Sequence, residues 1–515
     1  MVGRGVGGVR ASAFDTRSRA VVARAGQGLA ATVAHVSGIA GTFLAAGMLV
    51  SAAIGWCTDD PDAAELVLAG LVLGALSLTM WRGTRPAPDL TRTAAFTVVA
   101  AAWLYVFVAG TLPYVLAGTF DTYVQALYES VSGLTTAGSS VLDDIEGHGR
   151  GLLMYRQYTQ WFGGGGIVLL AIAILPGFGV GGLELAGAEI AGPTTEQIAH
   201  RVATTARWLW TIYVSLTLAV TGALMAVGVG LYDAVAHAMA TVPTGGFSTF
   251  DDSVAHFDSA AVEAVLIVGM LFGATSFALQ FRVFTRGPRR LIESPEWRTY
   301  ITIFGVGAAA CTAIVWASGT TLATSLRDAA FDVATVLTTT GFSTNDYTTW
   351  RPGAQLVLIV AMLIGGMTGS TAGGIKVLRA RIVLGHVWRD LRQARQPHGV
   401  FPVRLGRVTV PDDTVARIGA FVTLYLLTIL VGTTALAVLG EDLLTAFSAV
   451  VSNIGMVGLA MGEAGPHTNF GVFGDGSKLV LIVMMFLGRM ELYVALLMFV
   501  APVNAVRRAR RKGTR

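Results

Sequence analysis

Charged residues are scarce in this sequence. Only 13% of its 515 residues are Asp, Glu, Lys or Arg, whereas soluble domains contain about 25%. Cysteine is rarer still, with two residues, so neither a disulfide framework nor a cysteine metal site is expected. The eight histidines show no metal-ligand spacing, and no cluster of nucleophile, base and metal ligands falls at a helix end. These absences argue against a soluble protein and against an enzyme.

Apolar residues and glycine take the place of the missing charge. Hydrophobic residues make up 53% of the chain and 63 residues are glycine, as expected where transmembrane helices pack closely or break. The length allows about ten membrane spans joined by short loops. The first long apolar run begins near Leu29 without a short apolar segment and cleavage site before it, so no cleaved signal peptide is expected.

The placement of basic residues predicts the orientation of these spans. Most of the 36 lysines and arginines lie in six segments, 1–27, 82–92, 177–207, 282–298, 376–417 and 507–515. An excess of Lys and Arg marks the cytoplasmic side of a membrane. Both termini are therefore predicted to be cytoplasmic, and the acidic loops between these segments are predicted to face outside. The net charge of +4 reflects this topology, and no nucleic acid partner is expected.

A short stretch rich in Thr, Ser and Gly occurs four times between long apolar segments. The copies lie at residues 135–140, 243–249, 338–344 and 452–456. Their glycines align as Gly138, Gly246, Gly341 and Gly455, at intervals of roughly 100 residues, which is typical of divergent helix–loop–helix units around an axis. One such stretch is as easily an ordinary loop, but four in register favour four walls of one ion pore.

The chemistry of a pore explains these residue types. A dehydrated monovalent cation needs oxygen atoms in place of its water, and rings of backbone carbonyls supply them in potassium channels. Carbonyls can face the axis only if the backbone takes unusual angles, which glycine adopts without steric cost. A short helix before each stretch would add its negative C-terminal end. The re-entrant stretches are all predicted to enter the membrane from outside.

The predicted fold class is an all-α integral membrane protein with two N-terminal transmembrane helices and four pseudo-symmetric helix–pore loop–helix repeats around one central pore. The expected divisions are a cytoplasmic tail at 1–28, a two-helix domain at 29–91, and repeats at 92–204, 205–298, 299–411 and 412–515. The third repeat would contain a broken helix, because residues 365–374 hold five glycines within an apolar span from Gly353 to Val383. A glycine-rich helix packed tightly on its neighbours is the alternative.

Arg489 lies in the last apolar span, from Lys478 to Pro502. An intramembrane Arg costs about 2.5–3.5 kcal/mol on insertion scales, so it should face a cavity or a partner. Glu491 is two residues away and points elsewhere on a helix, so a direct pair between the two is not expected. A purely structural role inside the helix bundle remains open for this arginine.

These features together resemble the TrkH/KtrB family of bacterial potassium-uptake channels. The resemblance extends from about residue 29 to the end of the chain and includes the four stretches, residues 161–167 and residues 179–182. The two extra N-terminal spans are more similar to the TrkH branch. The resemblance implies potassium uptake across the plasma membrane of a bacterium, a homodimer with one pore per subunit, and a TrkA/KtrA-like cytoplasmic ring of nucleotide-binding regulatory subunits. Potassium would be the transported ion, with no organic cofactor.

The resemblance also implies residue roles. The filter residues would be Thr136, Ala137, Gly138, Thr244, Gly245, Gly246, Thr339, Thr340, Gly341, Asn453, Ile454 and Gly455. The gating residues would be Gly365, Gly366, Thr368, Gly369, Ser370, Thr371, Gly373, Gly374, Lys376 and Arg489. Glycine at all four aligned positions favours potassium over sodium, although the fourth stretch departs most from the Thr-x-Gly pattern.

Other transport functions remain as alternatives. The sequence leaves open a sodium-permeable relative and a symporter coupled to sodium or protons. A secondary carrier with a midplane substrate site also uses broken helices, but four repeats entering from one side favour a channel-like axis. The basic segment 386–411 fits either lipid headgroups or the docking of the regulatory ring.

Overall fold

The computed structural model describes residues 8–87, 92–178, 195–406 and 408–492, and they are almost entirely helical. The α-helices are α1 (Gly8–Cys57), α2 (Ala63–Gly83), α3 (Arg92–Ala109), α4 (Leu112–Ala117), α5 (Tyr123–Thr135), α6 (Arg150–Phe178), α8 (Thr195–Ala226), α9 (Leu231–Thr241), α10 (Ala260–Gly273), α11 (Phe277–Arg286), α12 (Arg289–Glu293), α13 (Pro295–Trp316), α14 (Leu322–Leu337), α15 (Pro352–Ile364), α16 (Val377–Arg395), α17 (Asp412–Val438), α18 (Leu443–Gly455) and α19 (Asp475–Arg489). Four 3-10 turns complete the helical elements: η1 (Ser253–Phe257), η2 (Tyr347–Thr349), η3 (Gly462–Ala464) and η4 (Phe470–Val472). The antiparallel strands β1 (Arg404–Leu405) and β2 (Val408–Thr409) form a small hairpin.

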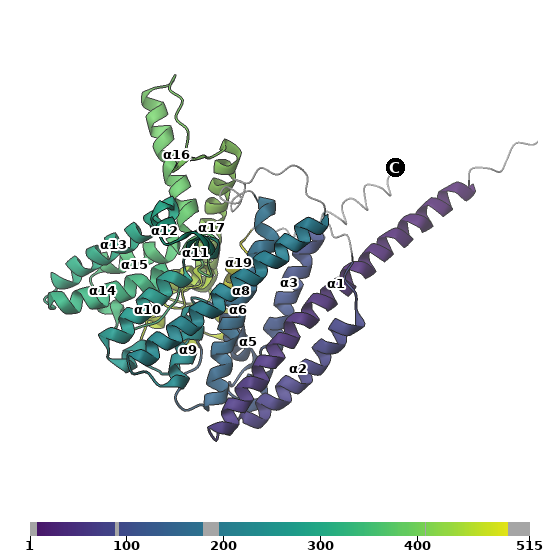
Figure 1. Ribbon diagram of the computed structural model, residues 1–515, viewed down its shortest axis with the longest axis horizontal. Helices are drawn as coiled ribbons and strands as arrows, with labels where there is room; N and C mark the ends of the chain where they lie inside the picture. The colour runs from purple at the N-terminus through teal and green to yellow at the C-terminus, as the bar shows by residue number, and fades with distance from the viewer. Residues whose placement is uncertain (1–7, 88–91, 179–194, 407, 493–515) are drawn as a thin grey trace, which may run out of the picture.

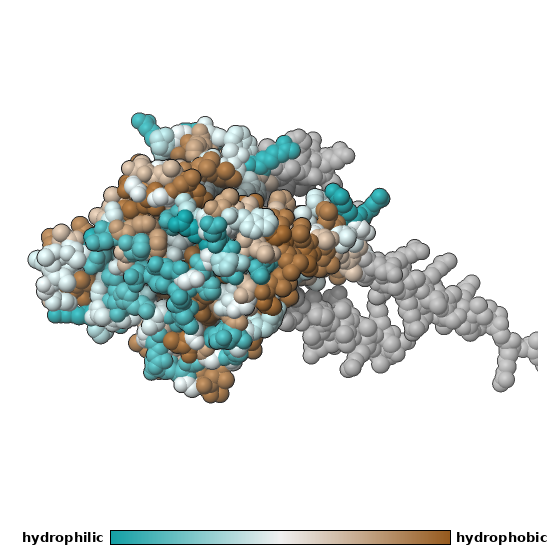
Figure 2. All heavy atoms as spheres, turned by 90° about the horizontal axis from the view of Figure 1, so that it is seen from below, coloured by the Kyte–Doolittle hydropathy of each residue, from teal (hydrophilic) through white to brown (hydrophobic). Residues whose placement is uncertain are grey.

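The described helices fit a membrane protein with many spans. Six of them are long and apolar enough to cross a membrane, and α10 with α11 would make a seventh, bent span. In Figure 1, α1 and α2 lie together on one side, α13 to α15 lie on the other, and α16 projects beyond the rest. Figure 2 shows polar side chains gathered over the middle of one end of the molecule, with hydrophobic side chains around them.

Four units of similar construction surround the centre. Each has a long helix, a short helix, an irregular segment and a second helix, and the short helices are α5, α9, α14 and α18. Three of the short helices begin with a side chain that accepts from a backbone N–H of the first turn: Thr122, Thr321 and Asp442. Such caps satisfy donors that a helix end leaves open. The short helices therefore have defined starts, which fixes how far each reaches into the molecule.

Two of the second helices are broken. α15 ends at Ile364 and α16 begins at Val377, which confirms the break predicted from the glycine-rich run. α10 and α11 are bent by 99° at residues 274–276, a break that the sequence analysis did not include. The two breaks are paired: Met367 N–H donates to Ala274 O, and Phe277 N–H donates to Gly369 O, each at 3.0 Å.

A run of glycines in α6 lets this helix approach two of the short helices. A side-chain carbon on Gly163 would collide with the carbonyl of Leu134, and one on Gly164 would collide with Pro243. Both contacts lie next to the irregular segments that follow α5 and α9. The glycines are therefore needed because larger residues would push α6 away from the centre.

The structure differs from two expectations about the chain ends. α1 begins at Gly8, inside the segment expected to be a tail, and α19 ends at Arg489, so Arg489 is not midway along a continuous helix. Met490 and Glu491 form a turn, with Glu491 at φ 49°. The family-like stretch 179–182 and the C-terminal basic cluster lie outside the described residues.

Candidate functional site

The four short helices end in the same way. After each helix comes a residue other than glycine in the left-handed conformation: Thr136, Thr244, Thr339 and Met456, with φ from 55° to 60°. The next residue's N–H bonds to the carbonyl five positions back, at 2.8–2.9 Å, in all four copies. This is the Schellman ending, which turns the chain sharply out of a helix. Threonine is rare in this conformation because its side chain branches at Cβ, so three such threonines indicate a constrained site.

Each left-handed residue is followed, two positions later, by a glycine with positive φ: Gly138, Gly246, Gly341 and Gly458. We call residues 136–138, 244–246, 339–341 and 456–458 the ring segments. A Cβ atom on each of these glycines would collide with a backbone carbonyl of the neighbouring segment. The colliding carbonyls are those of Gly245, Thr340, Val457 and Ala137, in that order, which closes a ring. Glycine is therefore the one residue that lets the segments meet this closely.

The fourth ring segment corrects the predicted register. Asn453, Ile454 and Gly455 are the last residues of α18, three positions before the residues that close the ring. The Asn453 side chain accepts from the hydroxyls of Tyr128 and Ser139 instead, at 3.1 and 2.9 Å. Aligning Gly455 with the other three glycines places the fourth segment three residues too early, because this segment has Met456 where the others have Thr.

A signal for the right register was present. In the first, second and fourth units the left-handed residue follows the residue before the short helix by 14 positions, from Thr122, Gly230 and Asp442. The nine other predicted filter residues, which belong to the first three stretches, do lie in the ring.

The loop between α15 and α16 lies against the start of the ring segments and contacts the threonine hydroxyls of two of them. The Thr339 hydroxyl accepts from Gly373 N–H at 2.9 Å, and the hydroxyls of Thr244 and Thr371 are 3.2 Å apart. Thr371 also faces the carbonyl oxygens of Val242 and Gly273, at 3.2 and 3.1 Å. The loop is thus held to two ring segments by threonine hydroxyls.

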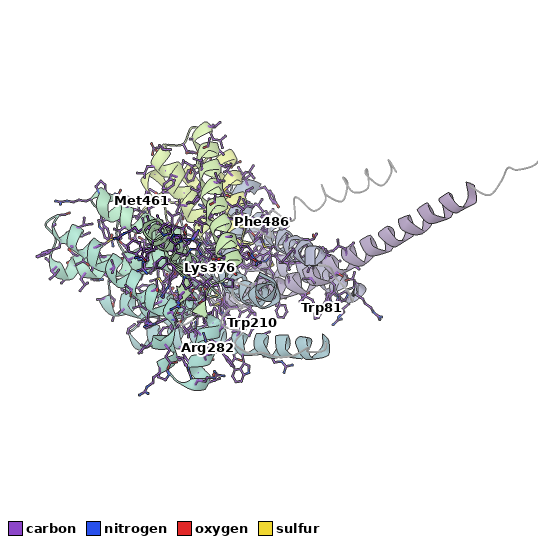
Figure 3. The ribbon with its side chains drawn as sticks, turned by 90° about the horizontal axis from the view of Figure 1, so that it is seen from above. Trp81, Trp210, Arg282, Lys376, Met461 and Phe486 are labelled. Atoms are coloured by element: carbon purple, nitrogen blue, oxygen red, sulfur yellow. The ribbon has the colours of Figure 1, made fainter. Side chains whose placement is uncertain are left out.

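Glycines in this loop make further close contacts. A Cβ on Gly373 would collide with the carbonyl of Gly455, and one on Gly365 would collide with the carbonyl of Gly373. Thr368 N–H donates to a carboxylate oxygen of Glu296 at 2.7 Å. Of the ten predicted gating residues, the nine from 365 to 376 lie in this loop, which reaches the centre of the molecule; Lys376 is near the middle in Figure 3.

Arg489 joins the loop to Thr136, the threonine of the first ring segment. Its guanidinium donates to the Thr136 hydroxyl at 3.1 Å, to Gly163 O at 2.6 Å and to Thr371 O at 3.5 Å. The side chain is 3% exposed, and no described acidic residue forms an ion pair with it. A buried arginine whose hydrogen-bond partners are neutral oxygens keeps its full positive charge at the site.

Two further basic side chains, Lys376 and Arg379, line the same cavity as Arg489. Glu491 pairs with Lys376 at 3.7 Å and with Arg379 at 2.6 Å, which agrees with the expectation that it does not pair with Arg489. These four side chains line one cavity together with Gly373, Tyr425 and Met456. The cavity therefore lies beside the ring and carries a net positive charge.

The described residues contain no group of three His, Cys, Asp or Glu side chains placed to hold a metal ion. Oxygen atoms at the ring come from backbone carbonyls and threonine hydroxyls instead. These are hard, neutral ligands suited to an alkali cation that binds briefly.

Comparison with known proteins gives a consistent result. The family model for TrkH, described as a cation transport protein, matches residues 70–327 and 318–507. The Trk system potassium uptake protein TrkH of Halomonas elongata is 36% identical over 443 residues, covering 85% of this chain and 91% of the relative. TrkH of Escherichia coli K12 is 32% identical over 428 residues, covering 82% and 88%.

A solved structure is also similar. The crystal structure of the potassium transporter TrkH from Vibrio parahaemolyticus matches with a TM-score of 0.83 and 32% identity, covering 91% of this chain and 98% of the other. The match therefore includes the helical architecture described above.

Proposed function

Because the chain belongs to the TrkH family of cation transport proteins, we propose that it takes up potassium through a pore formed by the four ring segments. The observation that carries this proposal is the closed ring of backbone carbonyls at Ala137, Gly245, Thr340 and Val457. Such carbonyls can replace the hydration shell of a potassium ion. The four short helices end at this ring, so their negative ends favour a cation there.

The proposed filter combines the sequence prediction with the corrected register. It consists of Thr136, Ala137, Gly138, Thr244, Gly245, Gly246, Thr339, Thr340, Gly341, Met456, Val457 and Gly458. Glycine at the last position of each segment keeps the ring narrow, which supports selection of potassium over the more strongly hydrated sodium.

The loop at residues 365–376 and Arg489 are proposed to form the gate. The loop contacts the ring segments directly through Thr371 and Gly373, and Arg489 adds a positive charge beside the same path. A cation there opposes the passage of potassium. Opening would require the loop and the arginine to leave the ring threonines together.

The proposed orientation follows the positive-inside rule. Both termini and the basic segments would be cytoplasmic, and the exposed acidic loops around Asp143, Asp144, Asp251 and Asp252 would face outside the cell. Potassium would then enter at the acidic end, pass the ring, and meet the gate on the cytoplasmic side. The domain divisions predicted from the sequence are part of this proposal, with one helix–pore loop–helix unit in each repeat.

Partners are proposed for the surfaces that the helices leave open. α16 projects from the bundle and exposes Leu384, Trp388 and Leu391 on one side, by 70%, 60% and 54%. Arg389 on the same helix pairs with Asp412 at 2.6 Å, which holds the pKa of this arginine above its usual value. An exposed apolar stripe among arginines supports contact with a second subunit of the homodimer or with the cytoplasmic regulatory ring.

Ion flux through purified protein in liposomes tests this function. Uptake of potassium, rubidium, sodium and lithium would be compared at equal gradients, with protein-free liposomes as the control. We expect potassium and rubidium to pass and sodium and lithium to be excluded. Equal flux of all four ions would contradict a selective filter.

A sodium-permeable transporter is the second candidate, and one observation favours it. The fourth ring segment has Met456 at its first position, where the other three have Thr136, Thr244 and Thr339. A segment without this hydroxyl gives the ring fewer oxygen atoms on one side. Sodium flux that matches potassium flux in the same liposomes would identify this alternative.

A further inference from the structure

The four short helices differ at one position behind the ring. Seven residues before each left-handed residue lie Glu129, His237, Asp332 and Ala449. The first three are titratable side chains and are buried, with exposures of 0%, 1% and 0%. Buried charged and polar groups are costly unless they are paired, so three of them at equivalent positions require an explanation.

Glu129 holds the part of the first segment that follows the ring. Its carboxylate accepts from the Ser140 hydroxyl at 3.0 Å and from Val141 N–H at 2.9 Å. Arg156, 1% exposed, pairs with Glu129 at 2.8 Å and also donates to the Ser248 carbonyl at 3.3 Å. One buried ion pair thus connects the ends of the first and second segments.

His237 makes the equivalent contact in the second segment. Its Nδ1 is 2.8 Å from the carbonyl oxygen of Asp233, and its Nε2 is 3.1 Å from the Ser248 hydroxyl. Because a carbonyl can only accept, Nδ1 carries the proton, and Nε2 is free to accept from Ser248. Ser140 and Ser248 both stand four residues after the left-handed residue of their segments.

The third and fourth segments are held differently. In the third segment the carboxylate oxygens of Asp332 make no hydrogen bond to the described residues, while Ser343, at the position of Ser140 and Ser248, donates to the carbonyl of Asn345 at 3.4 Å. In the fourth segment Ala449 replaces the titratable residue. There the hydroxyl of Ser448 accepts from Met461 N–H at 2.9 Å.

We propose that Glu129 and His237, with Ser140 and Ser248, are positioning residues that set the width of the filter and hence its discrimination between potassium and sodium. This rests on the proposed function. The carbonyl ring is built from irregular backbone, which has no regular pattern of backbone hydrogen bonds to fix the width of the ring. The buried side chains behind it supply that support, and the first two segments have the strongest.

Two substitutions of His237 separate positioning from simple packing. The amide of His237→Gln reaches the place of Nε2 and keeps an acceptor for Ser248, whereas the shorter amide of His237→Asn reaches only the place of Nδ1. Both are neutral and polar. We expect His237→Gln to keep most of the potassium-to-sodium flux ratio and His237→Asn to lower it by about tenfold, as the loss of one buried hydrogen bond allows.

Serine-to-alanine substitutions give a second test that perturbs folding little. Ser140→Ala and Ser248→Ala remove the hydroxyls that bond to Glu129 and His237. Ser343→Ala is the matched control, since its hydroxyl bonds only to a backbone carbonyl near its own segment. We expect the first two to lower the flux ratio severalfold and the control to leave it unchanged. Size-exclusion profiles would confirm that all three remain folded.

Two outcomes overturn the proposal. One is a wild-type flux ratio in Ser140→Ala and Ser248→Ala, and the other is an equal loss in the Ser343→Ala control. If the His237 variants fail to fold, the serine variants decide alone. Failure of the proposed function is distinguishable, because the wild-type protein itself would then show no preference for potassium in the same liposomes.

Discussion

Substitutions of two glycines that lie three residues apart in the fourth unit are expected to have opposite effects. A Cβ on Gly458 would collide with the Ala137 carbonyl, and its φ is +84°. Around Gly455 the nearest atom would be 3.5 Å away, which is ordinary contact. We therefore expect Gly458→Ala to abolish selective potassium flux or folding, and Gly455→Ala to retain both. Flux and monodispersity, measured in parallel for the two variants, check this.

This pair also tests the register. Loss of selectivity in Gly455→Ala with normal behaviour of Gly458→Ala would restore the alignment predicted from the sequence. Helix propensity does not explain the expected difference between the two variants. Gly455 ends a helix and Gly458 lies beyond it, so alanine at position 455 should if anything stabilise the helix.

Gly138→Ser extends the argument to the first segment. Glycine at this position has φ +76° and lies against the carbonyl of Gly245. A serine side chain would push the two segments apart and place a hydroxyl near the path, so the wider ring would admit sodium. We expect a lower potassium-to-sodium flux ratio with total cation flux preserved. An unchanged ratio in a folded variant would remove Gly138 from the proposed filter.

At the scale of elements, the loop between α15 and α16 offers a matched pair of threonines. The Thr371 hydroxyl contacts Thr244 and the carbonyls of Val242 and Gly273. The Thr368 hydroxyl is buried without a hydrogen-bond partner. Thr371→Val should loosen the closed loop and raise basal flux, because it removes a bond worth about 1 kcal/mol and leaves partners unsatisfied. Thr368→Val removes no hydrogen bond of the hydroxyl and should raise basal flux less than Thr371→Val does.

Arg489 belongs to the same closed arrangement. Arg489→Ala removes the positive charge and its bonds to Thr136 and Gly163. We expect severalfold higher potassium flux in liposomes without any regulatory subunit, since both the electrostatic barrier and the anchor of the loop are lost. Arg489→Lys should give a smaller increase, because it keeps the charge but cannot reach all three oxygens. Equal flux in wild type and both variants would exclude Arg489 from the gate.

The sequence predicted elements better than their junctions. The glycine run at 365–374 identified the broken third-repeat helix because glycine weakens a helix locally. The break between α10 and α11 was missed, since residues 274–276 are Ala, Thr and Ser, and the break is held by backbone bonds to Gly369 and Met367 far along the chain. Such pairing is a property of the fold. The place of Met456 at the start of the fourth ring segment was missed for a related reason. It follows from the close contacts between neighbouring ring segments, which the sequence does not show.

At the scale of the whole molecule, one carboxylate connects the N-terminal helix pair to the pore. Asp60 lies in the turn between α1 and α2, and its Oδ2 accepts from Gly151 N–H at 2.7 Å and from Leu152 N–H at 3.3 Å. These donors belong to the first turn of α6, which begins at Arg150. A helix start leaves such donors open and favours negative charge. The first two helices thus cap a helix of the first repeat.

This cap makes stability and ion conduction separable. Asp60→Ala should cost about 1–2 kcal/mol, because it leaves buried donors unpaired, and should lower the melting temperature of the purified protein by a few degrees. Asp60→Asn, which keeps one oxygen but loses the charge, should fall between this variant and wild type. Asp59→Asn is the control, since Asp59 is exposed and asparagine tolerates its φ of 54°. The potassium-to-sodium flux ratio of folded protein should stay at the wild-type value in all three variants, because Asp60 contacts α6 and not the ring. A changed ratio in Asp60→Ala would mean that the N-terminal helices shape the filter itself.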